Sequence, residues 1–175
     1  MSLRADAIDL RRALPGDAEA LARGAVEGVA GYVAFAPHGW APPELAAELA
    51  YTRALLADPD YHCFVAESGS AVVGQVTVVP AAKAARPVEE PDLAHLRNLY
   101  VDREHWGTGV ARALMGAAVE DAGARGFGAL RLFVAEGQAR ARRFYEREGW
   151  RPAGPPFFDA APGLSMVEYR RRVHD

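Results

Sequence analysis

The stretch that decides the fold is LYVDREHWGTGVA, residues 99–111. Its apolar start is typical of a β-strand end, and the glycines around Thr108 predict that a helix begins after a short turn. The first amides of a helix lack intrahelical acceptors and carry roughly half a positive charge, so such a turn suits a phosphate. The same pattern is also typical of an ordinary strand-to-helix turn. A dinucleotide-binding fingerprint is excluded, because Arg112 stands where its third glycine would fall.

A second informative stretch is QARARRFYEREGW, residues 138–150. Ala141, Phe144 and Tyr145 share one face of a predicted helix, and Gly149 suits a left-handed C-terminal cap. An aromatic pair at this spacing is by itself typical of core packing. Neither stretch therefore indicates a function by itself, and the two have to be considered together.

The segments around these stretches alternate between strand-like and helix-like patterns. Strands are predicted at residues 7–14, 61–67, 71–79, 93–101, 129–134 and 164–173, with another from Trp150, and helices at 15–30, 42–58, 107–125 and 138–148. This order mixes a hairpin meander with strand–helix units. It predicts an α+β fold with three layers around a mixed sheet, formed by residues 1–175 as a single domain.

Composition excludes several classes of function. Half of the 175 residues are hydrophobic and the net charge is −3, so neither disorder nor nucleic-acid binding is expected. Lys83, the only lysine, lacks the context of a phosphate-binding P-loop. The five histidines show no metal-ligand spacing, so no metal is expected. With a single cysteine, no signal-peptide pattern and no membrane-length apolar stretch, the sequence predicts a cytoplasmic protein with no membrane partner.

Taken together, the two stretches resemble the GCN5-related N-acetyltransferase (GNAT) superfamily, over most of the chain. The family's Q/R-x-x-G-x-G/A loop maps onto residues 106–111, where Gly109 and Ala111 match and Trp106 replaces the usual Gln or Arg. The family's N-x-x-A-x-x-F-Y-x-x-x-G-F motif maps onto residues 138–150, with Gln138 in place of the common Asn. The resemblance implies a mostly antiparallel sheet whose fourth and fifth strands splay apart.

The resemblance also implies acetyl-coenzyme A as co-substrate, with its pantetheine along the fourth strand and its pyrophosphate on the loop. The cofactor-binding residues are then expected to be Leu99, Tyr100, Val101, Trp106, Gly107, Thr108, Gly109, Val110, Ala111, Arg112 and Gln138. Most of these contacts would come from the main chain. The departure at Trp106 therefore has little expected cost, whereas the contact of Gln138 is less certain.

Catalytic roles follow from the same resemblance. Tyr145 falls where family members often place a phenol near the sulfur, and a phenol with an ordinary pKa of about 10 can protonate a departing thiolate. Some members carry a glutamate base on the fourth strand, and counting back from the loop gives His95, whose imidazole can accept an amine proton directly or through water. A solvent-facing or hydrogen-bonded strand histidine is the alternative.

The acceptor pocket of the family is usually formed by two loops, which here are residues 35–40 and 155–164. Their candidate acceptor-binding residues are His38, Trp40 and Asp159, although aromatic loops can equally form a dimer contact. The expected acceptor is a small-molecule amine or an amino-acid-like compound, and a homodimer stays open.

Two functions of different classes are consistent with these motifs. One is an acetyl-CoA-dependent N-acetyltransferase, in which a primary amine attacks the thioester directly. The other is a non-catalytic acyl-CoA-binding module of the same fold, acting as a sensor or partner subunit. Retention of Tyr145 and of the glycine loop favours the enzyme. A longer acyl group or a hydroxyl acceptor would change the substrate without changing the cofactor geometry.

Overall fold

The computed structural model describes residues 7–174. Its strands are β1 (Ile8–Arg12), β2 (His62–Ser68), β3 (Ala71–Pro80), β4 (Leu93–Val101), β5 (Ala129–Ala135), β6 (Arg151–Pro152), β7 (Phe157–Asp159) and β8 (Leu164–Arg172). Its α-helices are α1 (Ala18–Ala30), α2 (Leu45–Ala57), α3 (Val110–Ala124) and α4 (Ala139–Arg147). Short 3₁₀ turns are η1 (Pro15–Asp17), η2 (Gly31–Ala34), η3 (Ala81–Lys83) and η4 (Arg103–His105).

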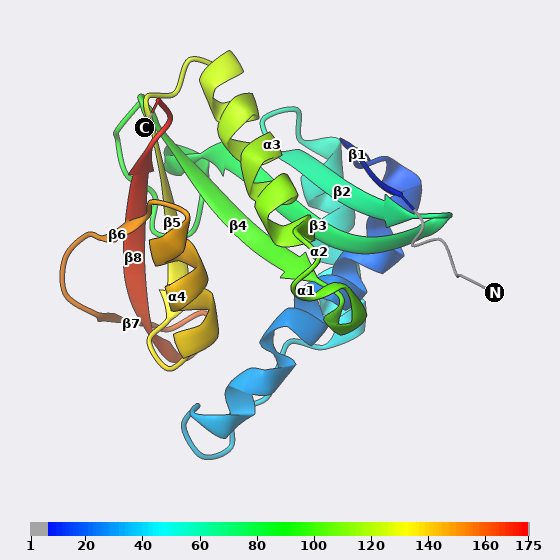
Figure 1. Cartoon of the computed structure of the whole chain (residues 1–175). Helices are drawn as coiled ribbons and strands as arrows, with labels where there is room; N and C mark the ends of the chain where they lie inside the picture. The colour runs from blue at the N-terminus through cyan, green and yellow to red at the C-terminus, as the bar shows by residue number, and fades with distance from the viewer. Residues whose placement is uncertain (1–6, 175) are drawn as a thin grey trace.

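The strands form one mixed sheet in the order β1-β2-β3-β4-β5-β8-β6, with β7 also paired to β8. Helices α3 and α4 cover one face of the sheet, and α1 and α2 cover the other (Figure 1). The pairings along the order are antiparallel except for β4 with β5, which is parallel. The predicted three-layer α+β fold, with a mostly antiparallel mixed sheet, is confirmed.

The main core lies between the sheet and helices α3 and α4. The apolar face predicted for the long central helix is buried there, because Leu114, Met115, Ala118 and Ala122 are all at most 1% exposed. From the other side of this core, α4 contributes Tyr145, which packs near Trp150 of the following turn. The core therefore packs α3, which follows β4, and α4, which follows β5, against the same face of the sheet.

The parallel pairing of β4 with β5 is short. It joins Leu93 to Ala129, Ala94 to Leu130 and His95 to Arg131, and it ends there although β4 continues to Val101. Beyond His95, β4 keeps only β3 as its neighbour. The predicted splay between the fourth and fifth strands is therefore present, and it leaves one edge of β4 unpaired in the middle of the sheet.

A β-bulge lies in this unpaired part of β4. Gln75 pairs with Tyr100 and Thr77 with Arg97, so that Val76 alone on β3 faces Asn98 and Leu99 on β4. Asn98 has a φ of +53°, the left-handed conformation that asparagine adopts more readily than most residues. Because such a bulge bends its strand and strengthens its twist, it helps β4 to diverge from β5.

Candidate functional site

The N-terminus of α3 opens beside the unpaired edge of β4. The helix begins at Val110 rather than at the predicted Gly107, because Gly107 and Gly109 have φ of +78° and +92°, which a right-handed helix cannot include. A Cβ built at either glycine would meet no atom within 4 Å, so the space above this turn is free of the described residues. Ala113 donates to the Gly109 carbonyl, whereas the amides before it point out of the first turn.

The signature loop before these amides is fixed by side chains. The Trp106 indole Nε1 donates to the Val101 carbonyl at 2.8 Å, and the Thr108 hydroxyl donates to the His105 carbonyl at 2.6 Å. Neither bond uses the amides of the α3 first turn. The Trp106 and Thr108 amides donate to the Arg103 and His105 carbonyls, at 3.2 and 3.4 Å. The loop therefore has a fixed shape, while the amides from Gly109 to Arg112 stay available to a ligand.

Trp106 also makes a contact that reaches across the splay. The guanidinium carbon of Arg140, in the first turn of α4, lies 3.4 Å from the centroid of the Trp106 ring. Arg103 approaches the same ring at 5.6 Å. The indole is 45% exposed, so the loop presents an aromatic face with cations on it at the mouth of the site.

The three strand residues expected along the pantetheine have their side chains engaged within the protein. The Tyr100 side chain turns to the opposite face of the sheet, where its hydroxyl donates to Glu27 Oε2 at 2.6 Å. Burial and this neighbouring carboxylate raise the pKa of Tyr100. Leu99 packs against the main core, and the Val101 carbonyl is the acceptor for Trp106.

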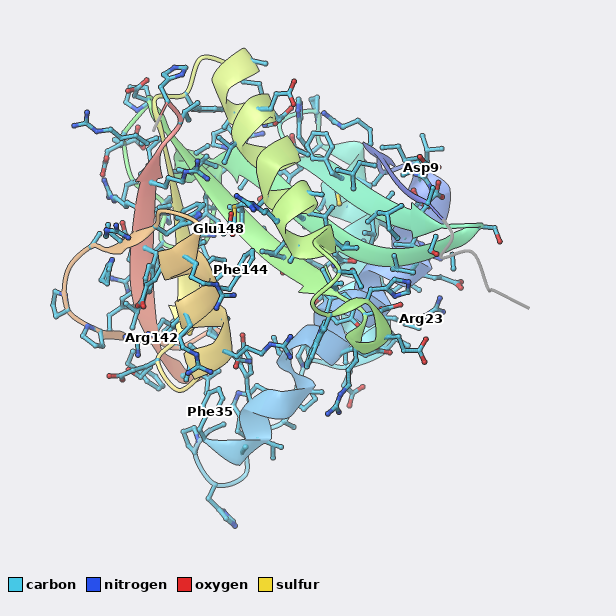
Figure 2. All side chains as sticks on the ribbon, in the orientation of Figure 1. Asp9, Arg23, Phe35, Arg142, Phe144 and Glu148 are labelled. Atoms are coloured by element: carbon cyan, nitrogen blue, oxygen red, sulfur yellow. The ribbon has the colours of Figure 1, made fainter. Side chains whose placement is uncertain are left out.

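Arg112 and Gln138 lie at the two helices that flank the splay. Arg112 is exposed, and its Nε lies 3.4 Å from Glu148 Oε2 at the end of α4. Figure 2 shows Glu148 at the upper end of α4, opposite α3. Gln138 is the N-cap residue of α4, with its amide bonded to the Ala135 carbonyl, and its side chain has no hydrogen bond to the described residues.

Tyr145 is held on α4 by a cluster of aromatic rings. Its ring centroid lies 5.6 Å from that of Phe144, 6.1 Å from Trp150 and 6.2 Å from Tyr169. Burial, with a smaller effect of nearby Tyr32, raises the pKa of Tyr145 above its ordinary value. The phenol therefore stays protonated at neutral pH, as a proton donor must.

His95 is the last residue of β4 that pairs with β5, and it is 5% exposed. Its imidazole packs edge-on against Phe133, with centroids 4.9 Å apart, and its Nδ1 is buried without a hydrogen-bond partner among the described residues. Burial, followed by the charges of Arg131 and Arg97, lowers the pKa of His95 to about 3. The ring is therefore neutral at neutral pH and only weakly basic.

Arg131, opposite His95 on β5, is a buried charge that the sequence reading missed. It is 1% exposed, and its Nη2 donates to the carbonyls of Arg86 at 2.7 Å and Ala85 at 3.1 Å. These bonds hold the loop between β3 and β4 against the sheet. The signal was present in the sequence, since an arginine interrupts the otherwise apolar run ALRLFV and a buried charge needs partners.

The two loops expected to form the acceptor pocket meet in the structure. The Trp40 indole donates to the Pro162 carbonyl at 2.6 Å, and one aromatic residue of each loop, Trp40 and Phe157, packs against Ala135, Leu164 and Met166. Tyr32 joins this group, stacked near Trp40 at 6.2 Å. Tyr32 was not predicted, although its spacing from the loop aromatics could have suggested it.

The three predicted acceptor residues have different surroundings. Trp40 is half-buried in the contact just described. Asp159 stabilises its own turn, because its Oδ1 accepts from the Ala161 amide at 3.0 Å. His38 is exposed, with no contact to the other predicted site residues. The loop also touches the start of α4, since a Cβ on Gly137 would lie 2.5 Å from the Phe35 ring, which Figure 2 shows below α4.

Within residues 7–174, no group of three or more His, Cys, Asp or Glu side chains is placed to hold a metal ion. In the same residues, no helix combines the length and apolar character that crossing a bilayer requires.

Comparisons with known proteins agree with this geometry. Human N-acetyltransferase 8B is 36% identical over 101 residues, which are 55% of this chain and 41% of that protein, so the match spans less than half of its length. The structure of an acetyltransferase from Thermus thermophilus superposes with a TM-score of 0.71 at 23% identity, covering 97% of this chain and 99% of that one. The yncA structure from Salmonella typhimurium, determined with its cofactor acetyl-CoA, gives a TM-score of 0.69 at 17% identity, covering 97% and 95%.

A family model matches more than half of the chain. The model of the acetyltransferase (GNAT) family matches residues 29–150, which include β4, the loop before α3 and all of α4 with its following turn. These are the elements that form the splay and the open helix N-terminus. The chain belongs to the acetyltransferase (GNAT) family.

Proposed function

We propose that this protein is an acetyl-CoA-dependent N-acetyltransferase that acetylates a primary amine by direct attack on the thioester. The observation that carries the proposal is the open first turn of α3, with its two left-handed glycines, beside the unpaired edge of β4. An amide-lined turn suits a diphosphate, and a free strand edge suits the amide groups of pantetheine. Each charge-assisted hydrogen bond to the diphosphate would contribute roughly 1.5–3 kcal/mol.

The proposed step transfers the acetyl group from the sulfur of coenzyme A to the nitrogen of the amine. The amine lone pair attacks the thioester carbonyl, so that a C–N bond forms and the C–S bond breaks. The attacking nitrogen releases a proton to water, the leaving thiolate gains one from the Tyr145 hydroxyl, and water reprotonates the phenolate. The raised pKa of Tyr145 keeps it protonated at the start of this step, and it also makes the phenol a weaker acid than a free tyrosine.

In this proposal His95 does not act as a strong general base. An imidazole with a pKa of about 3 accepts hydrogen bonds at neutral pH but holds a full proton poorly. We assign its imidazole to accepting a hydrogen bond from the amine, or from a water beside it, through the ring nitrogen other than the buried Nδ1. The amine would then enter in its neutral form, and water would take the proton that the nitrogen loses after attack.

The acceptor is proposed to be a small amine or an amino-acid-like compound. The aromatic surroundings of Phe133, Phe157 and Trp40 favour an acceptor with an apolar body next to its amine. The arginines Arg131, Arg86 and Arg97 on the same side of the sheet would favour a carboxylate over a second cation. This preference makes polyamines the weaker candidates.

Thiol release in the presence of acetyl-CoA tests the proposal. The protein would be assayed against a panel of amino acids, arylalkylamines and polyamines, with product masses measured for each positive reaction. We expect release that depends on the amine and a product heavier by one acetyl group. Tight binding of acetyl-CoA with no release across the panel would instead indicate the non-catalytic binding module.

A further inference from the structure

The loop before α3 lacks the cationic or amide side chain that the Q/R-x-x-G-x-G/A pattern places at its first position. Trp106 stands there instead, and an indole offers neither a positive charge nor several donors to a diphosphate. Its single N–H donates to the Val101 carbonyl. The main-chain amides of the loop remain, so a side-chain charge on the diphosphate would come from another residue.

Arg140 brings a guanidinium to the same place from a different element. It lies in the first turn of α4, yet its guanidinium carbon is 3.4 Å from the centroid of the Trp106 ring. Because α3 and α4 are on the same face of the sheet and follow the two diverging strands, this contact spans the mouth of the splay (Figure 1). The contact is therefore made between the two walls of the proposed binding site.

The charge on Arg140 is available to a ligand. No ion pair ties its guanidinium to a carboxylate of the described residues, and the residue is exposed. Arg112, another cation at this mouth, is already shared with Glu148 at 3.4 Å, and Arg103 lies farther from the Trp106 ring, at 5.6 Å. A guanidinium lying flat on an aromatic ring keeps its N–H groups at the edge, where they can still donate to phosphate oxygens.

We infer that Arg140, held on the face of Trp106, is a diphosphate-binding residue for coenzyme A and replaces the side chain missing from the signature loop. This inference rests on the proposed function, because it assigns a residue to the same cofactor. Trp106 acts as the positioning residue, since its ring limits the freedom of a long side chain. The pair also links the α3 loop to α4, so bound diphosphate would hold the two walls together.

Isothermal titration of the purified protein with coenzyme A and with dephospho-coenzyme A tests the assignment. Both ligands contain the diphosphate, and only the first has the 3′-phosphate. For Arg140→Gln we expect the dissociation constants of both ligands to rise roughly 5- to 20-fold by the same factor. Arg53→Gln is the matched control, because Arg53 is an exposed arginine on α2, on the opposite face, and should leave both constants within twofold.

A double-mutant cycle tests the part played by the indole. Trp106→Leu also removes the bond to the Val101 carbonyl, so it should weaken coenzyme A binding in both backgrounds. Its effect should be at least threefold smaller in Arg140→Gln than in the wild type. Fully additive effects would overturn the positioning role. An unchanged dissociation constant in Arg140→Gln, or a loss confined to coenzyme A itself, would overturn the diphosphate assignment. Failure of the wild-type protein to bind either ligand would instead contradict the proposed function.

Discussion

His95 of β4 and Arg131 of β5 face each other as the last paired residues before the two strands separate. Both are buried, and both pack against Phe133, at 4.9 Å from the imidazole and 4.8 Å from the guanidinium carbon. A neutral imidazole beside a permanent cation avoids placing two positive charges together in the sheet. The pairing with Arg131 therefore favours the neutral form of His95 at the point where the proposed site begins.

The buried His95 makes stability depend on pH. Its folded pKa of about 3 lies below the ordinary 6.5, so between these values the unfolded chain binds a proton that the folded chain does not. The free energy of unfolding should therefore fall as the pH drops through this window, by up to about 1.4 kcal/mol per pH unit from this group. Above pH 6.5 the group contributes no pH dependence.

Urea denaturation of the wild type and of His95→Leu at pH values from 7 down to 4 measures this effect. The variant lacks the titrating group, so its stability should fall less steeply on acidification than that of the wild type. Both proteins share all carboxylates and all other histidines, so the pH dependence that these groups cause cancels in the comparison. Parallel curves would show that His95 titrates normally in the folded protein.

The glycines of the α3 turn should differ in effect from a glycine within the helix. Gly109→Ala places a Cβ on a residue with φ of +92°, which should cost about 1–2 kcal/mol of stability and weaken coenzyme A binding. Gly116→Ala is the matched control in the same helix, with no atom within 4 Å of the added Cβ and no positive φ. That change should raise stability by up to about 1 kcal/mol.

Thermal unfolding and coenzyme A titration of both variants check this prediction. If Gly109→Ala bound coenzyme A as well as the control, the left-handed turn would have no part in binding. Open space at both glycines means that any loss in Gly109→Ala comes from the backbone conformation rather than from a clash within the protein.

Tyr145→Phe should separate the proposed acid step from binding. The change removes one hydroxyl from a ring that keeps its neighbours Phe144, Trp150 and Tyr169. We expect kcat to fall roughly ten- to a thousandfold, the usual range for a general acid, with the dissociation constant for acetyl-CoA almost unchanged. Steady-state kinetics and titration measure the two quantities.

Tyr32→Phe is the control for Tyr145, because it removes a second buried phenol that influences the pKa of Tyr145 without lying on α4. It should lower kcat much less. An unchanged kcat in Tyr145→Phe would remove that residue from the mechanism, and a larger loss in Tyr32→Phe would transfer the role.

Gly137 and Phe35 couple the start of α4 to the predicted acceptor loop. Gly137→Ala would bring a Cβ within 2.5 Å of the Phe35 ring, so the ring and its loop must move. We expect a higher KM for the amine with little change in acetyl-CoA binding. The double variant Gly137→Ala/Phe35→Ala should recover most of the amine affinity lost in the single variant. Equal losses for both substrates would show that this loop does not belong to the acceptor side.

Local sequence patterns predicted most of the elements. The hairpin expected at residues 61–67 and 71–79 corresponds to β2 and β3, and the helix expected at 138–148 corresponds to α4 within one residue at each end. These segments have a clear period of apolar residues and a glycine at their boundary. The prediction failed for β7, because the run at 152–163 is rich in Pro and Gly and its pairing with β8 depends on a distant strand.

The site was predictable only where a single segment defines it. The glycine turn follows from local spacing, whereas the role of Tyr145 and the acceptor loops were implied by the family resemblance and stay predictions. The contact of Trp106 with Arg140, the left-handed bulge at Asn98 and the carbonyl bonds of Arg131 depend on residues far apart in the chain, which no local period encodes. The low pKa of His95 likewise arises from burial by the whole sheet.

The central claim is that the amides of the α3 turn bind the diphosphate of coenzyme A next to the free edge of β4. Titration of the ¹⁵N-labelled protein with coenzyme A, followed by amide NMR, tests it directly. We expect the largest chemical-shift changes at residues 107–112, with smaller changes along 97–101. Saturable binding that leaves the amides of residues 107–112 unshifted would contradict it.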